Sequence, residues 1–277
     1  MKKSHLIVTI VLVVVGLLLT AAAIFATDFT FDFFDRDTTQ TTHEITEDFQ
    51  NISIRVDTAD VRFFLSEDET CKVISTEAKG EYHFVQVDGD TLSIGHGINR
   101  RWYEGLFSFG KMALDIYLPQ SRYVGFHLRS DTGDLDMPAD FLFSKADVET
   151  DTGHIRWLAN VTGRCAITTD TGDVELAGVQ LSKLELETDT GDVVLSHTVA
   201  ANRMDIETNT GDVTFVHADG ETIHVETDTG DVTGTFATEK LFRGESDTGR
   251  IKIPWDTRGG DCIVETDTGN IILSVAE

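Results

Sequence analysis

The stretch that decides the fold is TDTGDVELAGVQLSKLELETDTGDVVL, which covers residues 169–195. Residues on either side of its two Thr-Asp-Thr-Gly-Asp units alternate between apolar and polar, as in strands with one buried face. Glycine permits the positive φ angle that a tight corner needs, and the preceding aspartate can close an Asx turn. Each unit therefore predicts a strand, a corner, a second strand and a return loop of roughly nine residues.

The same corner recurs at a steady period of 19 or 20 residues, which is typical of a stacked repeat protein. The corner glycines are Gly133, Gly153, Gly172, Gly191, Gly211, Gly230, Gly249 and Gly269. One repeat cannot bury its apolar edge alone, so successive repeats must stack. We predict an all-β fold: a parallel β-solenoid with coils of about 19–20 residues, in which equivalent positions form columns at a spacing of roughly 4.8 Å.

The register of the repeats makes three predictions about packing. One inward column should contain Leu128, Val148, Ile167, Leu186, Ile206, Val225 and Val264. Cys165 and Cys262 share another inward column but lie five coils apart, well beyond the roughly 7 Å between Cα atoms that a disulfide allows. Gly234 and Gly244 replace apolar residues at inward positions, so the coil near 234–244 should be irregular.

The N-terminal segment predicts a membrane anchor. Residues 6–26 carry no charge, and about 20 such residues span a bilayer as a helix. Lys2 and Lys3 precede this run, so the positive-inside rule leaves residues 28–277 outside the cytoplasm. We expect residues 1–27 to be one N-terminal transmembrane helix of a single-pass protein of the cell membrane. A cleaved signal peptide is the alternative.

Three further segments follow the anchor. Residues 28–43 are predicted to be a juxtamembrane linker, 44–129 a variable beginning of the solenoid, and 130–277 its regular part. In the variable part, VDTADV from Val56 keeps the corner with Ala59 in place of glycine. Residues 96–110 break the alternation and predict an exposed loop. That loop contains the candidate partner-binding residues Arg100, Arg101 and Trp102.

Composition excludes some classes of function. The chain has 48 Asp and Glu against 22 Lys and Arg, a formal net charge of −26. A nucleic-acid-binding protein needs a basic face to displace counterions from phosphates, so no nucleic-acid partner is expected. Three cysteines in 277 residues cannot form a disulfide scaffold.

The corner aspartates would stack as like charges, which repel one another across adjacent strands. Screening by solvent and salt is one explanation of how the fold tolerates them, and charged faces also keep strand edges soluble. The alternative is that calcium bridges neighbouring corners in weak sites, with dissociation constants of about 10⁻⁴–10⁻³ M. The candidate calcium ligands are Asp131, Asp151, Asp170, Asp173, Asp189, Asp192, Asp228 and Asp231. No other cofactor is expected.

The acidic residues allow two catalytic interpretations. Asp-Thr-Gly is also the tripeptide of aspartic proteases, but those enzymes need two facing carboxylates that share one proton, and stacking would place these aspartates in one row. Some glycosidases on β-solenoids use two or three carboxylates on one face. Active sites interrupt a repeat locally, whereas here the acids are the repeat itself. We therefore expect no enzyme.

Alternating early strands, a strand that ends in Leu118-Pro119 and repeated (S/T)-D-T-G-D units resemble the bacterial family of putative adhesins, domain of unknown function 4097. The resemblance covers about residues 44–275. It implies a membrane-anchored, surface-facing solenoid, sometimes linked to envelope stress regulation, with no agreed activity and so no catalytic residue to carry over.

The sequence thus predicts a non-enzymatic, extracytoplasmic surface protein that presents an acidic β-solenoid as an adhesin or envelope-sensing module. Its expected partners are the membrane, through the N-terminal helix, and an envelope polymer or a membrane protein. Two alternatives stay open. One is an enzyme that acts on envelope polysaccharide, and the other is a regulator of a membrane partner in the envelope stress response, acting through the helix or the 96–110 loop.

Overall fold

The computed structural model describes residues 38–78, 80–98, 112–255 and 257–276. These residues form 22 strands and no helix, so the described chain is all-β. Accordingly, the described ranges contain no apolar helix of membrane-spanning length. The predicted anchor, residues 28–37 of the predicted linker, and Arg100, Arg101 and Trp102 lie outside the described residues.

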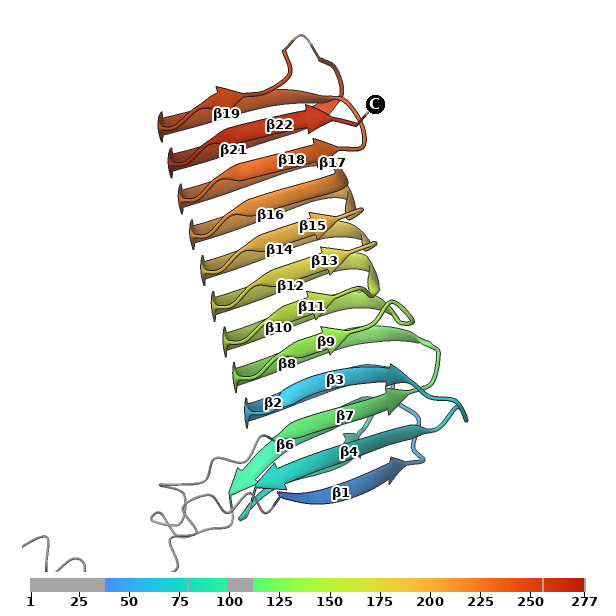
Figure 1. The fold of residues 1–277 in the computed structure, drawn as a ribbon. Coiled ribbons are helices and arrows are strands. Elements are labelled where there is room, and N and C mark those ends of the chain that lie inside the picture. The colour runs from blue at the N-terminus through green and yellow to red at the C-terminus, as the bar shows by residue number, and fades with distance from the viewer. Residues whose placement is uncertain (1–37, 79, 99–111, 256, 277) are drawn as a thin grey trace, which may run out of the picture.

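The strands stack as coils whose two sides form two sheets (Figure 1). In spatial order, the long-strand sheet contains β5 (Glu81–Asp88), β6 (Thr91–Ile98), β2 (Asn51–Thr58), β8 (Arg122–Thr132), β10 (Leu142–Thr152), β12 (Asn160–Thr171), β14 (Gln180–Thr190), β16 (Val199–Thr210), the second half of β17 (Val213–Thr229), β21 (Gly260–Thr268) and β19 (Lys240–Thr248).

The opposite side of the coils is the short-strand sheet. In spatial order, it contains β1 (Thr38–Ile45), β4 (Cys71–Ala78), β7 (Ala113–Leu118), β3 (Asp60–Leu65), β9 (Leu135–Met137), β11 (Ile155–Trp157), β13 (Val174–Ala177), β15 (Val193–Ser196), the first half of β17, β18 (Val232–Phe236), β22 (Ile271–Val275) and β20 (Ile251–Lys252).

From β8 to β22 every strand pair is parallel, which confirms the predicted parallel solenoid. The predicted inward column, from Leu128 to Val264, is also confirmed, because its members are register partners on adjacent strands. Each of these side chains is at most 3% exposed. The core between the two sheets is therefore a set of stacked apolar columns.

The corner glycines form one column because nothing larger fits there. A Cβ atom added to Gly191 would lie 2.1 Å from the carbonyl oxygen of Gly172, and one added to Gly211 would lie 2.0 Å from that of Gly191. The column begins at Ala59, whose carbonyl oxygen lies under Gly133. Positive φ angles, such as 153° at Gly191, add a second reason for glycine at several corners.

The order of the last two coils differs from the prediction of successive stacking. β21 pairs with β17 on one side and with β19 on the other, so the coil that ends the chain lies inside the stack. The glycine column has the same order, since Gly269 lies on Gly230 and Gly249 lies on Gly269. Coil 240–252 is thus the last layer. Near residues 234–244, where we predicted an irregular coil, the chain leaves the layer of β18 and skips the layer that coil 260–275 occupies.

Cys165 and Cys262 form no disulfide, as predicted, but they lie closer together than predicted. Cys71, Cys165 and Cys262 are all free and buried. Because of the changed coil order, Cys262 lies four strand steps from Cys165 rather than five.

The beginning of the solenoid is built differently. β2 and β3 lie between β6 and β7 on one side and β8 and β9 on the other, so this coil too lies inside later ones. Antiparallel pairs, β1 with β4, β4 with β7 and β5 with β6, close this end of the stack. β6 includes His96, Gly97 and Ile98, so the predicted exposed loop does not begin at residue 96.

Candidate functional site: the acidic face of the long-strand sheet

One outward column of the long-strand sheet is mostly acidic. In spatial order it contains Arg55, Arg129, Glu149, Thr168, Glu187, Glu207, Glu226, Glu265 and Glu245. Its last members are glutamates on adjacent strands, from Glu187 to Glu245, and all of them are exposed. Within the described residues, none of these glutamates belongs to an ion pair. We call the run from Glu187 to Glu245 the glutamate column.

Basic side chains on the same face neutralise a different column. Arg164 contacts Asp147 at 2.6 Å and also pairs with Glu185. Lys183 pairs with Glu185 as well, on the same strand. The hydrogen bond from Arg164 lowers the pKa of Glu185, so this carboxylate stays ionised. Arg164 and Lys183 are thus engaged with other acids, and within the described residues they form no ion pair with the glutamate column.

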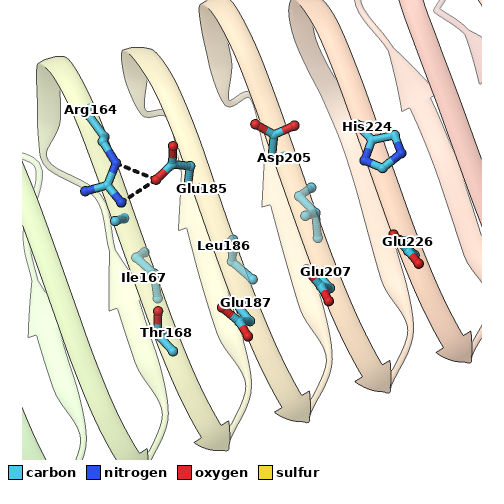
Figure 2. Close-up of a pocket in the computed structure, with 12 residues that line it drawn as sticks. Arg164, Ile167, Thr168, Glu185, Leu186, Glu187, Asp205, Glu207, His224 and Glu226 are labelled. Atoms are coloured by element: carbon cyan, nitrogen blue, oxygen red, sulfur yellow. Dashed lines mark hydrogen bonds and ion pairs between the residues drawn. The ribbon is translucent and has the colours of Figure 1, made fainter.

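A shallow groove of about 400 Å³ runs across β12, β14, β16 and β17 over this face. Figure 2 shows Arg164 and Glu185 at one side of it and Glu187, Glu207 and Glu226 in a row at the other. Leu186 and neighbouring residues of the inward column form its floor. Hence the groove is a feature of the repeat, with an acidic row along its length.

The aspartate after each corner glycine has a structural role. Asp192 Oδ1 accepts a hydrogen bond from the backbone N–H of Asp212 (2.9 Å), and Asp212 Oδ1 accepts one from Asp231 (2.8 Å). The ladder continues because Asp231 Oδ1 accepts a hydrogen bond from the backbone N–H of Asn270 (2.7 Å). Asn270 Oδ1 in turn accepts one from the backbone N–H of Arg250 (3.1 Å). The amide of Asn270 lowers the pKa of Asp231. Each such side chain therefore links one coil to the next at the corner.

The candidate calcium ligands divide into two sets. Asp173, Asp192 and Asp231 follow a glycine and belong to this ladder. The others precede a glycine and point outward as an exposed column, namely Asp131, Asp151, Asp170, Asp189 and Asp228. Among the described residues, no group of three or more His, Cys, Asp or Glu side chains is arranged to hold a metal ion. The calcium sites remain a prediction.

The short-strand sheet carries balanced charges instead. Arg62 pairs with Asp115 at 2.7 Å. Arg156 lies between Asp136, at 3.0 Å, and Glu175, at 3.7 Å. These pairs join adjacent strands of the sheet. Opposite charges thus alternate along the outward column from Asp115 to Glu175, in contrast to the like charges of the glutamate column.

A buried cluster in the antiparallel end was not found by sequence reasoning. Glu77 is 7% exposed and accepts a hydrogen bond from the backbone N–H of His83 at 2.7 Å. The ring of His83, 3% exposed, lies 5.8 Å from that of His96, which contacts Asp57 at 2.9 Å. These residues belong to four different strands, and no local spacing signals their proximity.

No described cysteine is a reactive nucleophile. Burial raises the pKa of the Cys71, Cys165 and Cys262 thiols to about 12. A thiol with such a pKa is protonated at neutral pH, and reactivity requires the thiolate. The cysteines therefore act as small apolar core residues.

The sequence profile of the family described as Toastrack DUF4097 matches residues 49–261. The chain belongs to this family. The match spans both the antiparallel end and most of the regular stack, which together make the Toastrack fold. No curated protein matches the chain.

One of three similar solved structures, with a TM-score above 0.5, shows a similar fold. A putative adhesin from Bacteroides fragilis is 13% identical, with a TM-score of 0.52 over 87% of this chain and 97% of that one. A putative adhesin from Parabacteroides distasonis is 12% identical, with a TM-score of 0.43 over 87% and 98% of the two chains. A putative lipid binding protein from the same organism is 13% identical, with a TM-score of 0.43 over 86% and 97%. At these identities the likeness concerns the fold alone.

Proposed function

We propose that this Toastrack protein is a non-enzymatic surface protein that presents the glutamate column to a positively charged partner outside the cytoplasm. It would act as an adhesin or an envelope-sensing module, with residues 1–27 as its single-pass anchor. The partner would be an envelope polymer or a membrane protein that carries cationic groups. The loop with Arg100, Arg101 and Trp102 is a second proposed contact for a membrane partner.

The observation that carries this proposal is the uncompensated glutamate column. Exposed carboxylates repeat on adjacent strands from Glu187 to Glu245, while Arg164, Lys183 and Arg203 of the same face are engaged with Asp147, Glu185 and Asp205. A row of like charges on a flat, rigid sheet attracts an extended partner with opposite charges, and the summed field speeds its association. The opposite sheet, with alternating charges, produces no such field.

The repeat also supports a non-enzymatic role. Every carboxylate along the groove has an equivalent on a neighbouring coil, so no position along the groove is distinguished as a reaction centre. Catalytic sites place two groups in different environments so that their pKa values separate. A binding face for a repetitive polymer needs only the regular spacing that the stack provides.

Binding of polylysine by the full-length protein tests the proposal. We expect polylysine binding that weakens as salt is raised, because exposed charges are screened. The variant Glu187→Gln/Glu207→Gln/Glu226→Gln should lose most of it. The matched control Glu67→Gln/Asp140→Asn/Glu239→Gln removes the same charge from exposed loops and should bind as the wild type does. Equal losses in both variants would show that net charge alone is responsible and would refute a role of the column.

A further inference from the structure

The end of the solenoid formed by residues 240–255, which we call the tip, exposes apolar side chains. Trp255 is 88% exposed, Leu241 43% and Ile251 42%. Ile271, the register partner of Ile251 in the layer beneath, is fully buried. The tip lies at the opposite end of the stack from β1 (Figure 1).

The two strands of the tip each keep one free edge. Among the described residues, β19 pairs only with β21, and β20 pairs only with β22. At the other end of the stack, antiparallel strands close the core, and the edge strand β1 begins with the polar run Thr-Thr-Gln-Thr-Thr. Repeat proteins need terminal repeats with a polar outer face, and open strand edges pair with other chains. No described strand caps the tip in this way.

The charges on β19 indicate what covers it. Inside the stack, arginines pair with acids on adjacent strands, as Arg129 does with Glu149 at 2.9 Å. Arg243 has Ile263 as its only strand neighbour, and within the described residues neither Arg243 nor Glu245 forms an ion pair. Both side chains are exposed on the outward side of β19. A strand added to the free edge would have to supply an acid opposite Arg243 and a base opposite Glu245.

We propose that the tip binds the tip of a second copy of this chain, through antiparallel pairing of the two β19 strands about a two-fold axis at Gly244. In that register each Arg243 lies directly opposite the Glu245 of the other copy, so both charges find partners at once. Gly244 faces Ile251 and Ile253, since a Cβ atom at this position would lie 3.3 Å and 3.6 Å from them. The axis therefore also lies close to apolar side chains of the tip. The second copy covers these side chains.

An antiparallel second copy satisfies these charges with residues of this chain itself. A further parallel coil of the same repeat type would extend the glutamate column and place another acid beside Glu245, which repels it. A lipid surface would cover Trp255 and Leu241 but would offer Arg243 and Glu245 no specific opposite charges. The two-fold arrangement closes on itself, so it predicts a dimer and not a fibre.

The test uses sedimentation equilibrium of the full-length protein in detergent, at low and high salt. We expect a dimer that weakens with salt. Arg243→Glu alone and Glu245→Arg alone should each raise the dissociation constant at least tenfold, because each places like charges opposite each other twice. The double variant Arg243→Glu/Glu245→Arg restores both pairs and should dimerise as the wild type does. Arg122→Glu makes the same charge change on β8, far from the tip, and should have no effect.

Mixing the two single variants gives the sharpest result. Arg243→Glu has acids at both positions and Glu245→Arg has bases at both, so the mixture should form heterodimers although each variant alone is monomeric. This outcome also shows that both variants are folded. A wild-type protein that stays monomeric, a dimer insensitive to all these changes, or a double variant that is not restored would overturn the proposal. Vesicle binding by a monomer that is lost in Trp255→Ser would assign the tip to lipid instead.

Discussion

The antiparallel beginning of the solenoid, residues 38–118, and the regular stack, residues 122–275, bury their cores by different means. In the stack, each coil lies on a near copy of itself, so the backbone fit at the corner determines which residues are allowed. At the beginning, strands of both directions meet, and side chains such as the Glu77 and His83 pair fill the space between them. Repetition therefore imposes strict local rules only where neighbouring layers are alike.

The largest change in the free energy of unfolding that this comparison predicts is at the corner glycines. Gly191→Ala should destabilise the protein by about 4 kcal/mol or more, because its Cβ would lie 2.1 Å from the carbonyl oxygen of Gly172 and both groups are backbone. Ala59→Gly, at the first position of the same column, should cost only about 1 kcal/mol through added flexibility. Urea denaturation of both variants measures the difference.

Gly178→Ala is a second control, which separates steric crowding by the neighbouring coil from strain in the backbone. Gly178 has a φ of 71°, but a Cβ added to it would meet nothing within 4 Å. Gly178→Ala should therefore cost about 1–2 kcal/mol from the left-handed conformation alone. If Gly191→Ala costs no more than Gly178→Ala, close stacking is not the reason for glycine at the corners.

The next effect concerns the aspartate ladder. Asp192→Ala removes the acceptor for the backbone N–H of Asp212 and should cost about 1–2 kcal/mol. Asp192→Asn keeps an oxygen in place, as Asn270 does in the same column, and should cost less. Asp170→Ala, at the exposed position before a glycine, should be neutral or slightly stabilising because it relieves repulsion. Equal costs at both aspartates would contradict the ladder.

Calcium tests whether the corners of the stack bind cations. If weak sites exist, millimolar calcium should raise the melting temperature, and a chelator should reverse the rise. At 5 mM calcium, one site with a dissociation constant of about 10⁻³ M would add about 1 kcal/mol of stability. The beginning of the solenoid lacks the repeated corners, so its hydrogen exchange should not change. An equal rise with sodium chloride of matched ionic strength would show that screening suffices.

The smallest effect expected is a pH dependence confined to the beginning of the solenoid. Burial lowers the pKa of His83, and the charge of Glu77 partly offsets this change. A histidine whose folded-state pKa lies below its unfolded value of about 6.5 binds fewer protons when folded, so stability falls as the pH drops below that value. The protection factors of amides in β4 and β5, which correct the exchange rates for the pH dependence of the intrinsic rate, should then be lower at about pH 5 than at pH 7.5.

The matched variants for this test are His83→Leu and His127→Leu. His83→Leu removes the buried titrating ring, so the difference in protection factors between the two pH values should shrink. His127 is exposed on β8, and its replacement should leave the difference unchanged. A pH dependence that survives in His83→Leu would have to come from another group.

The sequence by itself determined the repeating unit of this protein. Alternation around each corner and the constant spacing of the glycines were enough to predict parallel coils, the inward column from Leu128 to Val264 and the absence of a disulfide between Cys165 and Cys262. These features depend on residues close together in the chain, or on a period that brings equivalent residues into register. The acidic character of the outward face could be predicted in the same way.

Only the tertiary structure decided the order of the layers and what each charge contacts. Coil 260–275 follows coil 240–252 in the chain but lies between it and the layer of β17 and β18, an order that the period of the repeat does not encode. The arrangement places Phe242 against Phe236, with ring centres 5.6 Å apart, and leaves Trp255 at the surface. The cluster around His83, the ladder from Asp192 and the free edge of β19 all depend on such contacts between layers, which no local pattern encodes.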